Sequence, residues 1–248
     1  MSNGIKIRVS GWRLFFAGDI SFVQAFHKTL PTRWQWELSQ KAITVKLFGK
    51  PFIIPDGNIP VFISLVSEII HSNQYHVELI RDASFVADAG ANMGIFSIFV
   101  ARIHPTATIY AFEPAPSTFA ALRENVRDYP NIKIFNYGLG DENTKAFMVL
   151  KESSIGHYVG DGNVPIEIRT LDSFGLRADF LKIDTEGYEA NILKGAAETI
   201  KKCKPSVVMS AYHKPGDKEN LPKLLNSITP YTCALKSDFE EDLVCLPT

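Results

Sequence analysis

The stretch SFVADAGANMGIFSIFVARIHPTATIYAFE, residues 84–113, decides the fold. It opens with a short β-rich apolar run that ends at Asp88, passes through a turn that contains glycines, and continues into the apolar run 94–103. That run has the length and density of a core helix, and a second β-rich run then ends at Glu113. This order predicts a strand, a tight turn, a helix and a second, parallel strand.

The same alternation extends along the rest of the chain. Further β-rich runs lie at 132–138, 179–184 and 205–212, and helical stretches lie at 117–128, 188–202 and 217–228. Additional strands are expected at 144–150 and 163–170, and YTCALKS with DLVCLP is expected to form a closing hairpin. The pattern predicts the α/β class, with a doubly wound, mostly parallel sheet that carries helices on both faces. Ligands of such sheets bind at the carboxyl ends of the strands.

Residues 1–80 have a different texture. Apolar positions recur at helical spacing in 19–30 and 60–80, and AITVKLFGKPFIIP at 42–55 alternates around a Gly-Lys-Pro break. We therefore expect residues 1–80 to form a helical cap with a small β-hairpin on the substrate side. Residues 81–248 are expected to form the cofactor-binding domain.

Composition limits the classes of function. Apolar residues make up 46% of the 248 residues and charged residues 21%, which is typical of a soluble globular protein. A net charge of −1 gives no global basic surface, so nucleic acid is not an expected partner. No apolar run approaches the length of a membrane span or of a signal peptide core. Three widely spaced cysteines, Cys203, Cys233 and Cys245, suggest reduced thiols in the cytoplasm. A homo-oligomer is compatible with this composition.

The glycine turn indicates the kind of cofactor. Gly90 and Gly94 allow the backbone to approach a bound group closely, and Glu113 at the next strand tip can accept hydrogen bonds from both hydroxyls of a ribose. A dinucleotide site carries glycine where this chain has Asn92, because the pyrophosphate sits on the turn. Asp88 would repel a pyrophosphate but can receive the ammonium group of S-adenosylmethionine. The turn therefore favours S-adenosylmethionine over a nicotinamide dinucleotide.

Several segments resemble the FkbM family of methyltransferases. They are DAGANMGIFS, AFEPAPSTFAALRENV, NYGLGDE, TLDSF and FLKIDTEGYEANILKGA, in that order, and the resemblance spans roughly residues 55–232. It implies the Rossmann-like class I methyltransferase fold, a seven-stranded sheet whose last strand is reversed. It also implies S-adenosylmethionine as cofactor and O-methylation of a hydroxyl on a sugar or a glycosylated metabolite.

The resemblance further implies roles for individual positions. The methionine end of the cofactor is expected at Asp88, Gly90, Asn92 and Gly94, its ribose at Glu113, and its adenine at Gly140 and Asp141. Asp141 is expected to reach the exocyclic amine of the adenine. Asp184 and Glu186, at the tip of the strand predicted for 179–184, are expected to face the point of methyl transfer.

A hydroxyl that accepts a methyl group loses a proton, so a base beside it assists the reaction. Asp184 is the first candidate because it ends a central strand. His213 is the second, because it follows the next strand and its ordinary pKa of about 6.5 suits a base at neutral pH. Lys182 shares a strand face with Asp184 and is expected either to pair with it or to take part in the chemistry. Glu186 and Glu189 follow on the turn into a helix, where Glu189 is expected to stabilise the helix start.

Four further interpretations stay open. Asp184, Glu186 and His213 could converge on Mg²⁺, but such an ion prefers mostly oxygen ligands and the sequence has no dense carboxylate cluster, so no metal is favoured. An NAD(P)-dependent oxidoreductase is disfavoured by Asp88 and Asn92. A non-catalytic nucleoside-binding subunit is disfavoured by the intact turn at 184–187. The polar run 153–163, which contains His157, is either an acceptor-side loop or a solvated surface loop.

Overall fold

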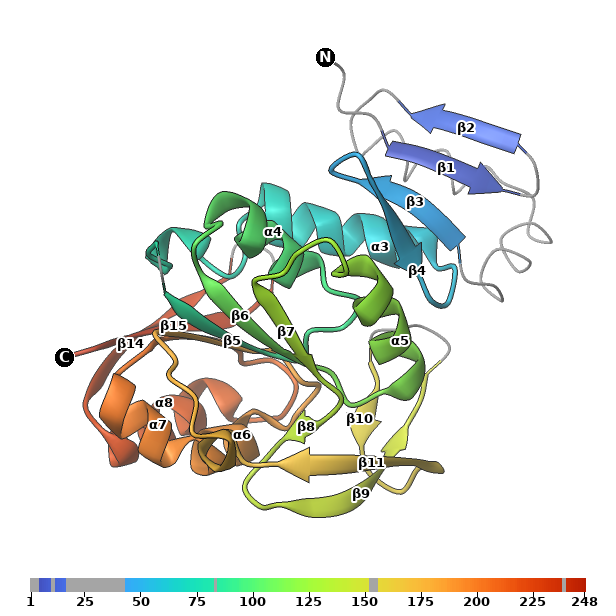
Figure 1. The fold of residues 1–248 in the computed structure, drawn as a ribbon. Coiled ribbons are helices and arrows are strands. Elements are labelled where there is room, and N and C mark those ends of the chain that lie inside the picture. The colour runs from blue at the N-terminus through green and yellow to red at the C-terminus, as the bar shows by residue number, and fades with distance from the viewer. Residues whose placement is uncertain (1–4, 10–11, 17–42, 83, 152–155, 238–239) are drawn as a thin grey trace.

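A computed structural model describes residues 5–9, 12–16, 43–82, 84–151, 156–237 and 240–248. In this part of the chain, a large central sheet with helices on both faces is accompanied by two smaller sheets, each of four strands (Figure 1). The helical stretch expected at 19–30 lies outside the described residues.

The central sheet has seven strands in the order β14-β15-β13-β12-β5-β6-β7. Their bounds are Phe85–Ala89 (β5), Thr108–Phe112 (β6), Ile132–Phe135 (β7), Phe180–Ile183 (β12), Ser206–Ser210 (β13), Tyr231–Lys236 (β14) and Asp242–Pro247 (β15). The five adjacent strands β13, β12, β5, β6 and β7 are parallel to one another, whereas β15 runs antiparallel to both of its neighbours. The predicted doubly wound α/β sheet, with its reversed last strand and closing hairpin, is confirmed.

Two sets of helices cover this sheet (Figure 1). One set is α3 (Ile59–Val66), α4 (Ile95–Ile103) and α5 (Pro116–Asn125), and the other is α6 (Glu189–Gly195), α7 (Ala197–Cys203) and α8 (Asp217–Ile228). Each set buries its own apolar cluster, with Phe62 and Leu122 in the first and Ile192 and Leu225 in the second. The single helix predicted for 188–202 is divided at Ala196.

The middle strands place the site. All residues of β12, and all of β5 except Phe85, are buried, as expected for parallel strands covered on both faces. Ala89 of β5 is in register with Phe112 of β6 and with Ile183 of β12. The residues that follow these three strands therefore meet at one edge of the sheet.

A second sheet is inserted between β7 and β12. It consists of β8 (Gly138–Leu139), β9 (Thr144–Val149), β10 (Tyr158–Val159) and β11 (Val164–Arg169), in the order β10-β9-β11-β8, and a 3₁₀ turn, η3 (Leu171–Phe174), follows it. The strands expected at 144–150 and 163–170 are confirmed as β9 and β11.

The segment before residue 80 differs in part from the prediction. The hairpin at 42–55 is confirmed as β3 (Ile43–Leu47) and β4 (Lys50–Ile54), but β1 (Ile5–Val9) and β2 (Trp12–Phe16) extend it to a four-stranded sheet. The sequence did not reveal this extension because β1 pairs with β3, a partner distant in the chain. The helical stretch at 60–80 is α3, then a π-helical turn η1 (Ser67–His71) and a 3₁₀ turn η2 (Val77–Leu79).

The described part of this segment is joined to the large domain. Asn125 of α5 accepts a hydrogen bond from the backbone N–H of Ile53 at 2.6 Å and donates one to its carbonyl oxygen at 3.0 Å. Phe52 of β4 belongs to the same apolar cluster as Phe62 and Leu122. The division at residue 80 is therefore bridged by a continuous core.

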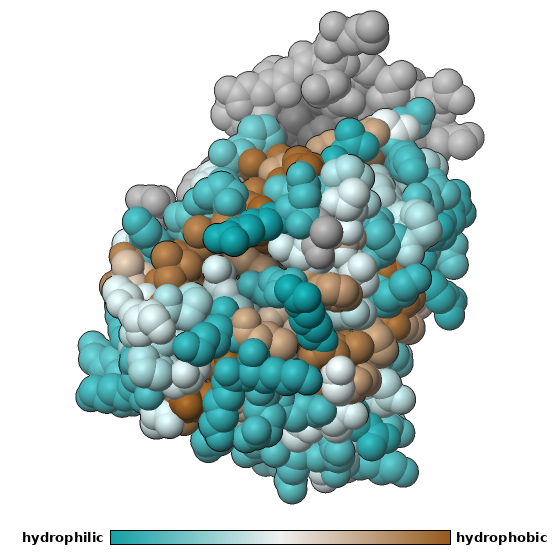
Figure 2. All heavy atoms as spheres, turned by 60° about the vertical axis from the view of Figure 1, so that its left-hand side comes forward, coloured by the Kyte–Doolittle hydropathy of each residue, from teal (hydrophilic) through white to brown (hydrophobic). Residues whose placement is uncertain are grey.

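The cysteine prediction is wrong for two residues. Cys233 and Cys245 form a disulfide between β14 and β15, where they are register partners, and Cys203 is free. Spacing along the chain did not indicate the bond, because strand pairing brings the two sulfurs together. None of the described helices is long and apolar enough to cross a membrane. On the face in Figure 2, hydrophobic residues reach the surface in separate spots among hydrophilic ones.

Candidate active site

The ends of β5 and β12 touch at a glycine. Gly90 has a φ of 77°, and a Cβ atom at this position would lie 1.9 Å from the carbonyl oxygen of Asp184. A side chain is therefore excluded, and the two strand ends lock together. Asn92, two residues on, also has a positive φ, which turns the chain toward α4.

Glu113 follows β6, the strand next to β5, and is 7% exposed. Its two carboxylate oxygens each accept a backbone hydrogen bond of 2.9 Å, from Asn92 and from Ala115. Burial raises the pKa of Glu113 to about 7, although these bonds and the charge of Lys182 oppose the shift. A carboxylate has about four lone-pair directions, so Glu113 can still accept hydrogen bonds from a ligand.

Lys182 corrects one expectation. Its Nζ lies 3.1 Å from Asp88 Oδ1 and donates to the carbonyl oxygen of Gly90 at 2.6 Å, rather than pairing with Asp184. Asp184 lies beyond the end of β12, so strand alternation no longer governs its direction, whereas Lys182 and Asp88 are register partners. Asp88 also accepts from Ser97 at 2.6 Å and is fully buried. The Lys182–Asp88 ion pair therefore stabilises the glycine turn that follows β5.

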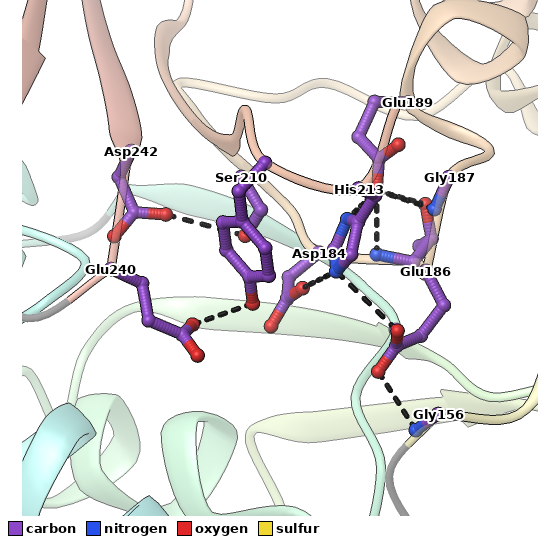
Figure 3. Close-up of polar contacts among 12 residues, drawn as sticks. Gly156, Asp184, Glu186, Gly187, Glu189, Ser210, His213, Glu240 and Asp242 are labelled. Atoms are coloured by element: carbon purple, nitrogen blue, oxygen red, sulfur yellow. Dashed lines mark hydrogen bonds and ion pairs between the residues drawn. The ribbon is translucent and has the colours of Figure 1, made fainter. Parts of the chain in front are cut away.

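Asp184 lies at the centre of a polar cluster (Figure 3). Tyr75 donates a hydrogen bond to its Oδ2 at 2.6 Å, and its Oδ1 lies 3.8 Å from Nε2 of His213. The second distance is beyond hydrogen-bond range. The side chain of Asp184 is 24% exposed and lines a cavity, so its carboxylate is accessible to a bound molecule.

His213 is held by Glu189. Its Nδ1 lies 2.9 Å from Glu189 Oε1, and its side chain is 7% exposed. Burial alone would lower the pKa of His213, but the hydrogen bond and charge of Glu189, with the charges of Asp184 and Glu186, raise it to about 9. His213 is therefore an imidazolium at neutral pH, and the expectation that its ordinary pKa suits a base is wrong. Glu189 is the first residue of α6, and it accepts the N–H groups of Thr185 and Gly187 in the turn before that helix.

Glu186 and His157 form the other side of the cavity. Glu186 Oε1 accepts from the backbone N–H of Gly156 at 2.8 Å, and burial raises the pKa of Glu186. His157 Nδ1 accepts from the backbone N–H of Lys151 at 3.0 Å, so its ring proton is on Nε2. Burial lowers the pKa of His157, which keeps it neutral at neutral pH.

These groups surround a cavity with about 930 Å³ of empty space, part of it open to solvent. Gly90, Glu113 and Asp184 line it, and the apolar side chains of Leu65, Ile69, Phe96 and Met148 complete its walls.

Four predicted cofactor residues do not line this cavity, and one of them is Asp88, which pairs with Lys182. Gly94 packs against α5, because a Cβ atom there would lie 2.8 Å from the side chain of Leu122. Gly140 packs against Tyr188 and Ile168, and Asp141 is exposed and accepts from Asn191 at 3.0 Å. Gly138 and Leu139 lie in the wall instead.

Comparison with known proteins decides the family. The model of the methyltransferase FkbM domain matches residues 88–241, which is more than half of the chain. The chain belongs to the FkbM methyltransferase family.

Two relatives and one solved structure illustrate the similarity. The 31-O-demethyl-FK506 methyltransferase FkbM of Streptomyces tacrolimicus is 52% identical over 52 residues, which cover 21% of this chain and 20% of that protein. The hexuronic acid methyltransferase AglP of Haloferax volcanii is 27% identical over 177 residues, which cover 63% of this chain and 67% of that protein. The crystal structure of methyltransferase FkbM from Methylobacillus flagellatus has a TM-score of 0.54 at 20% identity, covering 77% of this chain and 54% of that one.

The sequence reasoning missed part of the cavity of this methyltransferase. Tyr75, Leu65 and Ile69 precede the matched FkbM domain, yet all three line the cavity. The only sequence signal for Tyr75 was an aromatic residue within the polar turn SNQYH. His157, assigned either to an acceptor-side loop or to the surface, lines the cavity as well.

The polar cluster around Asp184 contains the three residues considered as Mg²⁺ ligands. Among the described residues of this FkbM methyltransferase, no group of three or more His, Cys, Asp or Glu is arranged to hold a metal ion. His213, one of the three ligands considered, already lies between Asp184 and Glu186 as a cation (Figure 3). Its charge opposes a metal there.

Proposed function

We propose that the protein is an S-adenosylmethionine-dependent O-methyltransferase that acts on a hydroxyl of a sugar or a glycosylated metabolite, with Asp184 as the base. The observation that carries this proposal is the position of Glu113 and Asp184 on one cavity, at the ends of β6 and β12, the two strands that flank β5 in the central sheet. One carboxylate suits a ribose and the other suits the proton of an acceptor.

The residues present fit the cofactor. Glu113 is buried, fixed by two backbone N–H groups, and faces the cavity, as a ribose anchor requires. The turn at Gly90 allows a close backbone approach, and Glu186 provides negative charge for an ammonium group. Asp88 is engaged by Lys182 and Ser97, so we propose that it positions the turn rather than contacting the cofactor. Gly138 and Leu139 would border the adenine.

Each residue near the acceptor has a defined task in this proposal. When bound, S-adenosylmethionine supplies a methyl group on a positively charged sulfur. Asp184 Oδ1 takes the proton of the acceptor hydroxyl, while Tyr75 holds Oδ2. His213, as an imidazolium, offsets the negative charge of Asp184 and Glu186. Holding the acceptor in line supplies most of the rate, on the order of 7–11 kcal/mol.

The walls suit a hydroxylated ring. Asp184, Glu186 and His157 offer hydrogen-bonding groups, and Leu65 and Met148 offer apolar surface for the carbon-bound hydrogens of a sugar. A relative named as a hexuronic acid methyltransferase supports an acceptor of the carbohydrate type.

Methyl transfer to a panel of acceptors tests the function. The protein is incubated with methyl-labelled S-adenosylmethionine and methyl hexopyranosides that carry neutral, amino or carboxylate groups, and products are identified by mass spectrometry and NMR. Label on a sugar oxygen is expected. Label only on nitrogen or carbon would contradict O-methylation, and binding of the cofactor without any transfer would favour the non-catalytic subunit.

Affinity for S-adenosylhomocysteine is expected to fall as the pH is lowered through about 7. Burial raises the pKa of Glu113 to about 7, and ribose hydroxyls donate to the ionised carboxylate. Above that pH Glu113 is ionised and affinity is constant, whereas below it affinity falls by up to about tenfold for each pH unit. Calorimetric titrations across this pH range measure the effect. A flat profile would contradict the role of Glu113.

Glu113→Gln is expected to weaken S-adenosylhomocysteine binding by about 10- to 100-fold, because hydrogen bonds to a charged group contribute roughly 1.5–3 kcal/mol. The pH dependence near neutrality should disappear with it. Glu124→Gln is the matched control, since Glu124 is an exposed residue of α5. Equal effects of the two substitutions would show that Glu113 does not contact the cofactor.

A further inference from the structure

Tyr75 lies before the FkbM domain and is in direct contact with the proposed base. Its hydroxyl donates to Asp184 Oδ2 at 2.6 Å, and its side chain is 2% exposed. We propose that Tyr75 is a positioning residue for methyl transfer, which fixes the Asp184 carboxylate so that Oδ1 faces the acceptor hydroxyl. This inference rests on the proposed function, because it assigns Tyr75 a role through Asp184.

The chain around Tyr75 is built to hold the phenol in place. Asn73 and His76 both have positive φ values, 52° and 50°, which residues other than glycine adopt infrequently. Asn73 accepts from the N–H of Val77 at 3.0 Å and donates to Glu78 at 2.5 Å, and His76 Nδ1 lies 2.9 Å from Glu78. Each turn residue is thus tied to the start of η2, and the turn presents Tyr75 to the strand end.

The aromatic ring is held on two sides. It packs edge-on against Phe96 of α4, with centroids 5.3 Å apart, and Lys182 Nζ lies 5.1 Å from its centroid. Burial and the charge of Asp184 raise the pKa of Tyr75 well above its usual value, so the phenol keeps its proton and acts as a donor. A neutral donor stabilises an ionised carboxylate without competing for the acceptor's proton.

Other charged and titratable groups also act on the Asp184–Tyr75 pair, from every element packed around it. They are Glu186 and His213 near the strand ends, Tyr212 after β13, Glu240 and Asp242 at β15, and Lys182 on β12. Three of these six groups are carboxylates. Tyr75 donates directly to Asp184, and His213 is the neighbouring cation.

The test is Tyr75→Phe, which removes one oxygen atom and keeps the ring. For the acceptor that the wild-type protein methylates, kcat is expected to fall by roughly tenfold or more, with KM for S-adenosylmethionine unchanged. The acidic limb of the pH–rate profile should move to higher pH, since the ionised carboxylate loses a donor. Asn73→Ala, which keeps the phenol and loosens the turn, should give a smaller fall in kcat.

The control is Tyr231→Phe, because Tyr231 is also a buried tyrosine and does not line the cavity. Its hydroxyl donates a hydrogen bond of 2.8 Å to the carbonyl oxygen of Pro205. It should leave kcat and the pH profile unchanged. An unchanged kcat and pH profile in Tyr75→Phe would overturn the inference, while methyl transfer by the wild type would still support the proposed function.

A contact measurement does not depend on the acceptor. Protein labelled with 3-fluorotyrosine carries one ¹⁹F label on each of its 8 tyrosines. The resonance of Tyr75 is assigned as the one that is missing from the spectrum of Tyr75→Phe. Asp184→Asn is expected to shift this resonance. If Asp184→Asn leaves the chemical shift of the Tyr75 resonance unchanged, the inference is overturned, even if Tyr75→Phe lowers turnover.

Discussion

Asp184→Asn is expected to lower kcat for methyl transfer by about 10²–10⁴-fold, the contribution of a well-placed general base. The amide keeps the shape of the carboxylate and can still accept from Tyr75, but it cannot take a proton from the acceptor hydroxyl. Affinity for S-adenosylhomocysteine, measured by calorimetry, should change little, because the ribose is anchored by Glu113 at the end of another strand, β6.

The matched control is Asp128→Asn, since Asp128 forms a surface ion pair with Lys50 at 3.5 Å and its side chain is 49% exposed. It should leave turnover unchanged. A full rate in Asp184→Asn would rule out Asp184 as the base, and loss of S-adenosylhomocysteine binding in that variant would assign it to the cofactor instead.

Lys182→Met is expected to lower the free energy of unfolding by about 3–5 kcal/mol, the cost of removing one partner from a buried ion pair. Methionine fits the space of the lysine chain but leaves the Asp88 carboxylate fully buried without its cation. It also removes the donor to the carbonyl oxygen of Gly90, so the turn should loosen. Urea denaturation measures the stability.

Lys201→Met serves as control for that experiment. Lys201 pairs with Glu198 at 2.9 Å on the surface of α7, where both side chains are at least half exposed, at 51% and 75%. Exposed pairs contribute about 0–1 kcal/mol. Equal losses of stability in the two variants would show that the Lys182–Asp88 pair has no special role.

The sheet and the strand-end residues could be predicted because they depend on local patterns. The strand, glycine turn and helix at 84–103 follow from a short run of sequence, and the next strand carries Glu113 to the same edge. Gly90 and Glu113 were therefore assigned to the site from spacing alone, and the cavity includes both.

Other features depend on partners far apart in the chain. Lys182 meets Asp88 because β12 and β5 are neighbours, and the Glu189–His213 pair forms across two strand ends. The pKa of His213 depends on that carboxylate, so its charge could not be derived from residue type. Tyr75 enters the site from a turn that precedes the domain, where the sequence has no periodic pattern to indicate its direction.

Calorimetric titration of the purified protein with S-adenosylhomocysteine, with NAD and NADP run in parallel, tests the central claim most directly. The account predicts micromolar binding of S-adenosylhomocysteine that Glu113→Gln weakens, and no binding of either dinucleotide. Binding of a dinucleotide, with no response to S-adenosylhomocysteine, would contradict the assignment of the turn at 88–94 and of the cofactor.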